Sequence, residues 1–515
     1  MNRISRCCLM LGVSMSFFLT GCGTDNTGEG ENSAAVDPVT RYMESMEGKS
    51  SASGDSAGSS DSSEAVASGS DDRGDDLPNI MENPAYSAMG RQVVTAVVTA
   101  PFRETMDRIT AFNESNPDYF IEMKSYGGGA ESFEALETQL PLEVLSGKGP
   151  DLVIWDGMNY SPALASDRLM ENLYDFMEAD PDFHREDYYE NILQAFEING
   201  GLYICPASFS VHTGCVWADE LGTDRGVTDG WTLGEMMQTY ENSPRAKTFA
   251  PNFTKEFQLQ FICEDCMGNF VDWNSGKCHF DTPEFVELLE WCNTFPEIFR
   301  DHIDYEGYAY LEGLRSGQIF WQPGVLNSAW EVAYKRVTSG DADLLWPGHP
   351  VADDERNLGG GVAAPYGECY SICLNSDNPK AAWEVVKSFL AADAEREVRG
   401  IPLLRSVSEE RIQDALTVEY ETVDGSRQEK IKWETFIVII EGTEEEIKFS
   451  CITEQDAETY RSIIGNTHRS YSSDPGILDI IMEEAGAYFG GDKDAATVAD
   501  IIQNRVSMYV GERMK

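Results

Sequence analysis

Short apolar segments and helical periodicities alternate in the part of the chain that begins near residue 91. Val93–Val98 and Tyr119–Tyr126 are rich in β-branched and aromatic residues, a composition typical of strands. Between them apolar residues recur every three or four positions, which predicts a helix that ends at Asn116-Pro117. The apolar positions of this helix are Phe102, Met106, Ile109 and Phe112.

The same alternation continues through a second helix and a third strand. The second helical pattern is interrupted by Pro141, and Asp151–Asp156 follows as a short buried strand. Such alternation predicts a parallel sheet covered by helices. Because ligands of open α/β sheets bind beyond the carboxyl ends of the strands, Tyr126 and Trp155, which end two of these strands, are candidates for a binding site.

The later part of the chain predicts a second α/β lobe. Ala207–Trp217 has the composition of a strand that crosses from one lobe to the other. Thr282 is the expected N-cap of a helix that begins at Pro283, and Asn378-Pro379 opens another helix. Gln318–Gln322 is predicted to be a strand of this lobe.

One segment, residues 416–451, has a different pattern. Its apolar and polar residues alternate, and Asp424-Gly425 stands between two alternating runs, which is a strong hairpin signal. A second break at Glu441-Gly442 leads to a third run. We therefore predict a small three-stranded antiparallel insertion.

The first 90 residues predict a secreted, anchored chain. Arg3 and Arg6 precede the apolar segment Leu9–Leu19, which is too short to span a bilayer, since spanning needs about 20 residues. Its ending at Cys22 resembles a bacterial lipobox, so residues 1–21 are predicted to be a signal peptide and Cys22 to carry lipid. Cleavage elsewhere, with Cys22 incidental, is the alternative. Residues 22–90, rich in Ser, Gly and Asp, predict a disordered tether.

Charge and cysteines limit the possible partners. The formal net charge of −51 disfavours nucleic acid and gives no attraction to an anionic membrane surface.

Without Cys7, Cys8 and Cys22 an odd number of cysteines remains, which argues against a fully paired disulfide framework. Cys263 and Cys266 with the later Cys278-His279 have the residue types of a zinc site, but we interpret them as buried packing residues. A disulfide and a metal remain alternatives; no metal or cofactor is expected.

From residue 91 to residue 515 the chain carries a series of short motifs whose order and spacing are more informative than any one of them. They are Phe112–Pro117, Gly149–Trp155, Gly200–Pro206, Gly230–Glu235, Phe270–Asp272, Trp346–Gly348, Tyr370–Ile372, Ser376–Trp383, and Ile501–Arg505 with Tyr509. Together they resemble the family-1 extracellular solute-binding proteins, the maltose-binding-protein-like receptors of ABC sugar importers. The 416–451 insertion and the long tether depart from that family's pattern.

The resemblance implies a type II periplasmic-binding-protein fold of class α/β, in which two discontinuous lobes close on a ligand like a hinge. The crossings are expected near residues 207 and 369. Lobe one would comprise 91–206 and 369–411, and lobe two 207–368 and 412–515. The implied protein is a monomeric receptor without catalytic residues. It would be lipid-anchored at the extracellular face of the membrane and would deliver a small solute, first of all a mono- or oligosaccharide, to the permease subunits of an ABC importer.

Sugars present apolar ring faces and hydroxyl groups, so a sugar site needs aromatic platforms and polar groups. The family pattern places candidate ligand contacts at strand ends and crossings of both lobes, and core packing is the alternative for each. Trp231 and Trp383 are expected in the core instead. The candidates are Tyr126, Trp155, Asp156, Phe209, Ser210, Trp321, Gln322, Trp330, Gly360 and Tyr366.

Three other functions remain open. A receptor for a peptide or a metal chelate would share the fold but not the ligand. A surface-anchored glycoside hydrolase would need two carboxylates at a defined separation, and 89 acidic residues make chance pairs plentiful. A purely structural surface protein is the third, and the ordered motifs argue against it.

Overall fold

The computed structural model describes residues 90–99, 103–124, 131–157, 164–166, 168–222, 224–250, 254–273, 275–298, 310–440, 443–471 and 473–513. The predictions for the signal peptide, for Cys22 and for the tether up to residue 89 lie outside these ranges, as does Tyr126. Within the described ranges, none of the helices has both the length and the apolar character needed to cross a membrane.

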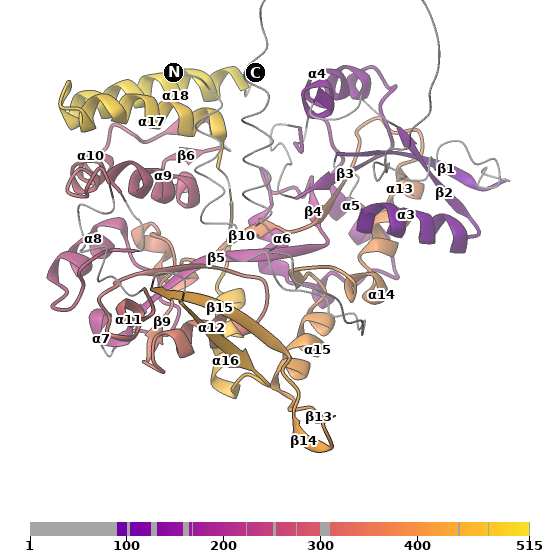
Figure 1. The fold of residues 1–515 in the computed structure, drawn as a ribbon. Coiled ribbons are helices and arrows are strands. Elements are labelled where there is room, and N and C mark those ends of the chain that lie inside the picture. The colour runs from indigo at the N-terminus through magenta and orange to yellow at the C-terminus, as the bar shows by residue number, and fades with distance from the viewer. Residues whose placement is uncertain are drawn as a thin grey trace, which may run out of the picture. The chain divides into compact units, whose positions relative to one another are not determined.

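The first sheet confirms the predicted parallel α/β arrangement. Its five strands are β1 (Gln92–Val98), β2 (Tyr119–Lys124), β3 (Leu152–Asp156), β4 (Cys205–Pro206) and β11 (Glu368–Ile372), in the order β2-β1-β3-β11-β4 (Figure 1). The strand β1 is parallel to both β2 and β3, whereas β11 runs antiparallel to β3.

Helices pack on this sheet as the apolar periodicity predicts. Helix α3 ends directly before Asn116-Pro117, and α4 continues through Pro141 rather than breaking there. Their bounds, with those of the other helices from the same parts of the chain, are α3 (Arg103–Ser115), α4 (Glu131–Leu145), α5 (Leu173–Ala179), α6 (Glu190–Ala195), α13 (Pro379–Phe389) and α14 (Ala392–Glu395).

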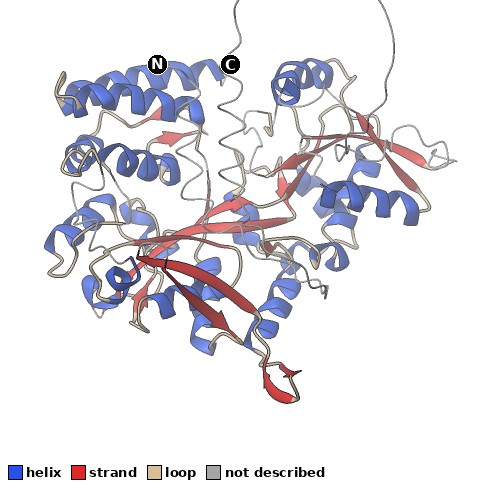
Figure 2. Ribbon diagram, in the orientation of Figure 1, coloured by secondary structure: helices blue, strands red, loops and turns tan. Residues whose placement is uncertain are grey.

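The second sheet is built around one long strand, β5 (Ser208–Trp217). Its neighbours β10 (Val362–Pro365), β8 (Gln322–Leu326), β9 (Leu344–Leu345) and β12 (Ile401–Pro402) all pair antiparallel with β5, and β17 (Arg469–Ser470) pairs with β10. Figure 2 shows this sheet in red among the helices of the second lobe.

Ten further helices and one short hairpin belong mainly to the second lobe. Thr282 caps α10 as predicted, because its hydroxyl accepts a hydrogen bond from the backbone NH of Phe285. The bounds are α7 (Ala218–Leu221), α8 (Leu233–Asn242), α9 (Lys255–Asp265), β6 (Val271–Asp272), β7 (Lys277–Cys278), α10 (Pro283–Cys292), α11 (Tyr310–Arg315), α12 (Trp330–Thr338), α15 (Arg405–Leu416), α16 (Glu454–Gly465), α17 (Pro475–Phe489) and α18 (Ala495–Arg513).

The chain passes between the two sheets at three places. It leaves the first sheet after β4 and enters β5 at once, and it returns from β10 to β11 through Tyr366-Gly367. The third passage follows α14 and enters the second sheet at β12. Backbones meet closely here, since a Cβ on Gly157 would lie 2.8 Å from the carbonyl oxygen of Gly367.

The predicted strand Gln318–Gln322 is displaced in the structure, where β8 begins only at Gln322. The preceding residues are extended, but they hydrogen-bond to another segment. The backbone NH groups of Phe320 and Trp321 donate to the carbonyl oxygens of Thr248 and Phe249 at 3.1 and 2.7 Å. Trp321 therefore lies before the strand that it was predicted to end.

The insertion has four strands in two hairpins rather than three strands in one sheet. The outer hairpin joins β13 (Tyr420–Val423) to β14 (Ser426–Glu429), and the inner hairpin joins β15 (Trp433–Ile440) to β16 (Thr443–Phe449). The predicted turn at Asp424-Gly425 is confirmed, with positive φ angles of 51° and 78° at the two residues. The strand Ser426–Glu429 was missed because its residues are all polar, so it shows no alternation.

Buried residues form three apolar clusters, and the buried cysteines belong to these clusters. The nine cysteines from Cys205 to Cys451 are free, and all except Cys451 are buried. Burial raises the pKa of the Cys263 and Cys266 thiols, which keeps them protonated. Trp231 and Trp383 are buried as predicted. Cys263, Cys266 and Cys278 thus line an apolar cluster in the helical part of the second lobe, whereas His279 is exposed.

Candidate functional site

Trp155 lies inside the first lobe, with no part of its surface exposed. It belongs to the apolar cluster that also contains Leu136 and Leu140 of α4. Its indole Nε1 donates a hydrogen bond to Ser371 Oγ at 2.8 Å. A strand-end position therefore does not give this indole a face on which a sugar ring could stack in the structure.

Trp321 is also completely buried, in the helical cluster of the second lobe. Its ring packs against Phe249 and His349, each with a centroid separation of 5.3 Å. A Cβ on Gly214 would lie only 2.2 Å from the indole Nε1, so this position of β5 requires glycine. The neighbouring Gln322 is 1% exposed, and its amide is hydrogen-bonded to Ser339.

The remaining candidates differ in exposure. Phe209 and Ser210 are neighbours on β5 and both are buried, as is Gly360. Trp330 and Tyr366 are half-buried, and Tyr366 lies directly in the passage from β10 to β11. For Asp156 the structure describes the strand but not the side chain. Trp155 and Trp321 are not brought together, because they belong to separate clusters.

A group of polar side chains that the sequence did not indicate lies on β5 two residues beyond Ser210. His212 Nδ1 is 3.0 Å from Asp265 Oδ1, and His349 Nε2 is 3.6 Å from Asp265 Oδ2. The His212 side chain is 25% exposed, whereas those of Asp265 and His349 are 7% and 2% exposed. One buried carboxylate thus holds two imidazoles, only one of which reaches the surface.

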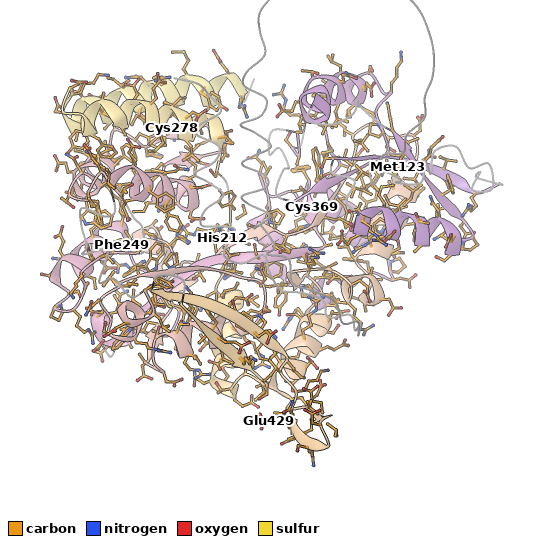
Figure 3. All side chains as sticks on the ribbon, viewed as in Figure 1. Met123, His212, Phe249, Cys278, Cys369 and Glu429 are labelled. Carbon is orange, nitrogen blue, oxygen red and sulfur yellow. The ribbon has the colours of Figure 1, made fainter. Side chains whose placement is uncertain are left out.

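A second carboxylate extends this group, which we call the polar cluster: His212, Glu264, Asp265, His349 and Tyr471. The Tyr471 hydroxyl donates to Glu264 Oε1 at 2.7 Å. The Tyr471 ring lies against the His212 imidazole, with the centroids 5.3 Å apart. Figure 3 shows His212 on β5 near the middle of the view, beneath the helices of the second lobe.

Burial and pairing set the charges of the polar cluster. Burial opposes ionisation of Asp265, but the two facing histidines outweigh it and hold the pKa of this carboxyl below its usual value. Burial lowers the pKa of His349 to about 4, only partly offset by Asp265, so this imidazole is neutral at pH 7. Burial raises the pKa of Glu264, although the Tyr471 hydrogen bond acts in the opposite direction.

The polar cluster was missed because its residues come from four distant parts of the chain, with His349 in the loop between β9 and β10. His212 comes from β5, Glu264 and Asp265 from the last turn of α9, and Tyr471 follows β17. One signal was available: in a strand, alternate residues share a face, so His212 lies on the same face as the predicted Ser210. Glu264 and Asp265 lie between Cys263 and Cys266, where the sequence gives no sign of a solute-binding site.

The polar cluster offers hydrogen-bonding groups and one aromatic ring. Carboxylate oxygens accept from hydroxyl groups, and a neutral imidazole can both donate and accept. Within the described ranges, no group of three or more His, Cys, Asp or Glu side chains is arranged to hold a metal ion. The carboxylate, imidazole and phenol groups of the cluster are groups that can exchange hydrogen bonds with the hydroxyl groups of a solute.

Comparison with known proteins supports the fold. No protein-family model matches the chain, and no curated protein matches it by sequence. Among solved structures, an oligogalacturonide-binding protein from Yersinia enterocolitica is similar to 82% of this chain over 100% of its own length, with 14% identity and a TM-score of 0.50. The chain has the solute-binding-protein fold. The two-lobed α/β architecture expected from the sequence is thereby confirmed.

Two further solved structures are similar to the chain. A de novo designed cysteine esterase covers 83% of this chain and 100% of its own, with 13% identity and a TM-score of 0.51. A family-1 extracellular solute-binding protein from Alicyclobacillus acidocaldarius covers 82% and 98%, with 13% identity and a TM-score of 0.47. Because one neighbour was designed as an esterase, the solute-binding-protein fold alone does not decide activity.

Proposed function

We propose that this protein is a receptor that reversibly binds a small carbohydrate between its two lobes. The single observation that carries the proposal is the polar cluster on β5, the strand that the chain enters directly after its first crossing. A site beside the crossings can contact ligand from both lobes, and the carbohydrate-binding names of several fold neighbours agree with this ligand class.

In this proposal the exposed edge of His212 and the Tyr471 ring meet the sugar. Glu264 and Asp265 fix the two rings through hydrogen bonds of 2.7 and 3.0 Å. A pyranose would place its C–H face on an aromatic ring and exchange hydroxyl hydrogen bonds with the imidazole. A ligand that binds the closed form more tightly would shift the lobes towards closure.

The ligand contacts predicted from the sequence have different roles in this proposal. Tyr366 and Trp330 keep exposed surface and remain candidate contacts, as do Tyr126 and Asp156. Phe209, Ser210, Trp155, Trp321, Gln322 and Gly360 are buried and would not contact the sugar directly. We further propose the lipid anchor at Cys22, a place at the extracellular face of the membrane, a monomeric state and delivery to an ABC permease. The proposal includes no catalytic residue and no cofactor.

The test is a titration of the full chain against neutral mono- and oligosaccharides, with peptides and metal chelates as comparison ligands. We expect saturable binding of at least one sugar, a smaller radius of gyration by X-ray scattering when it is bound, and unchanged sugar on chromatography afterwards. Binding of peptides or chelates alone would contradict the carbohydrate class. Cleaved sugar with multiple turnovers would show an enzyme instead.

A further inference from the structure

A separate pocket of about 350 Å³ lies beside β12 and the loop that joins β8 to α12. Helices α15 and α16 complete its walls. The residues that line it include Asn327, Trp330, Arg411, Asp414, Ala415 and Tyr460. Protein sites for small ligands usually enclose about 300 to 1,000 Å³, so this volume is at the lower end of that range and fits a monosaccharide-sized molecule.

This pocket lies on the other face of β5 from the polar cluster. Residues 210 and 212 share one face of the strand, and residues 209 and 211 share the opposite face. Phe209 packs edge-on against Tyr189, and the Tyr189 hydroxyl hydrogen-bonds to Ser408, which lines the pocket. A molecule in the pocket would therefore not contact His212.

The insertion supports the aromatic wall of the pocket. Trp330 is half-buried and packs against Phe449 of β16, with the ring centroids 6.2 Å apart. Phe449 in turn packs against Trp433 at 5.5 Å, and Trp433 against Tyr334 of α12 at 5.8 Å. The insertion thus supports the pocket's Trp330 from behind.

The charged residues at the pocket already have partners. Arg396 pairs with Glu410 at 2.9 Å, and Asp414 pairs with Lys432 at 3.0 Å. The Arg411 guanidinium donates to four backbone carbonyl groups of residues 395–400. An ionic ligand would have to displace these partners, so the pocket favours an uncharged molecule.

One polar atom of the lining is unsatisfied. The side-chain oxygen Oδ1 of Asn327 is buried and has no hydrogen-bond partner within the described part of the chain. A buried acceptor without a donor destabilises the protein, and a ligand hydroxyl that reaches it would recover part of that cost. The apolar residues Val407, Ile412 and Ala415 are among the other residues that line the pocket.

We propose that this pocket is a second binding site, for a neutral polyhydroxylated molecule of monosaccharide size or smaller. Its apolar face packs on Trp330 and its hydroxyl groups face Asn327. The site is independent of the carbohydrate proposed to bind at the polar cluster, and either site can exist without the other.

The experiment uses the full chain with glycerol, myo-inositol and D-glucose as probes, followed by calorimetry and by ligand-observed NMR. Ala415→Trp fills the pocket, and Ala496→Trp makes the same change at an exposed position of α18. We expect at least one probe to bind the wild type and Ala496→Trp equally, and Ala415→Trp at least tenfold more weakly. His212→Ala should leave this binding unchanged, which separates it from binding at the polar cluster.

Two results would overturn the proposal. One is the lack of saturable binding of all three probes to the wild type. The other is binding that Ala415→Trp leaves intact and His212→Ala removes, which would place the probe at the polar cluster. If Ala415→Trp does not fold, Asn327→Leu replaces it, since it removes the acceptor at similar volume. Unchanged affinity in a folded Asn327→Leu protein would also contradict the assignment.

Discussion

Two sets of aromatic and polar residues differ in how the protein uses them. Trp155 and Trp321 are the large residues that a strand-end rule selects, and neither has any exposed surface. His212 and Tyr471 carry smaller rings, and both retain exposed surface beside the buried carboxylate of Asp265 and the half-buried one of Glu264. A residue's place along a strand therefore identifies the edge of the sheet at which the residue lies. Its exposure depends instead on which helix or loop covers that edge.

Different parts of the chain cover the two tryptophans. Helix α4 packs on Trp155, and the segment around Phe249 together with His349 packs on Trp321. At His212 the neighbouring residues are polar, and the strand leaves the imidazole edge accessible. We therefore propose that the tryptophans stabilise the fold and that the polar cluster binds the solute.

The largest expected effect is on the free energy of unfolding, and it tests whether the buried tryptophans stabilise the fold. Trp155→Ala should destabilise the protein by about 3 to 5 kcal/mol, because it leaves a cavity and removes the hydrogen bond to Ser371. The measurement is urea unfolding followed by circular dichroism. Trp217→Ala is the matched control, since this tryptophan is half-buried, and it should cost clearly less. A loss at Trp155 no larger than that of the control would contradict the account.

An effect of intermediate size concerns pH and the polar cluster. His349 has a pKa of about 4 in the folded protein against an ordinary 6.5, so the unfolded chain binds a proton at higher pH. This contribution to stability is complete above pH 6.5 and is lost as the pH falls towards 4. Between pH 7.5 and 5 the loss is about 2 kcal/mol.

The measurement is the free energy of unfolding at the two pH values for the wild type and for His349→Gln. Other groups titrate in both proteins, so the difference between the two slopes isolates His349. We expect the variant to lose less stability on acidification. Equal slopes would show that His349 is not held neutral by burial.

The smallest effect concerns the two hairpins of the insertion, which repeat the contrast between buried and exposed residues. Every residue of β13 and β14 is exposed, whereas Phe449 of β16 is 7% exposed and packs on Trp330. Replacing residues 419–430 by Gly-Ser should change the unfolding free energy by less than about 0.5 kcal/mol, as is usual for exposed positions.

The comparison variant is Phe449→Ala, which should cost about 3 to 5 kcal/mol because it empties a packed site. Removing the whole of residues 418–449 is therefore expected to destabilise the second lobe rather than to leave it unchanged. Thermal unfolding of the three variants measures these changes in stability. A large loss from the outer deletion alone would show that β13 and β14 contribute to the core.

Much of the fold follows from the sequence because periodicity and capping are local signals. The first strand, the helix that ends before Asn116-Pro117 and the turn at Asp424-Gly425 were predicted within a few residues. The start of β8 was misplaced because extended residues before Gln322 pair with a segment far away in sequence. No local pattern reveals such a partner.

The candidate site could be predicted less well for the same reason. The sequence placed two candidate contacts, Phe209 and Ser210, on β5 beside the first crossing, where the polar cluster is now proposed to bind. The pairing of His212 with Asp265, 53 residues later, depends on how α9 packs on β5. A single histidine in a strand gives no sign of that partner, and burial of the tryptophans depends on tertiary packing in the same way.

The central claim is that solute binds at the polar cluster and not on the buried tryptophans. The most direct measurement compares the affinity of the best-binding sugar for His212→Ala, for Trp155→Phe and for the exposed control His184→Ala. We predict a loss of roughly ten- to a hundredfold in His212→Ala, and affinities within about twofold of wild type in the other two. A loss in Trp155→Phe with unchanged binding by His212→Ala would contradict the claim.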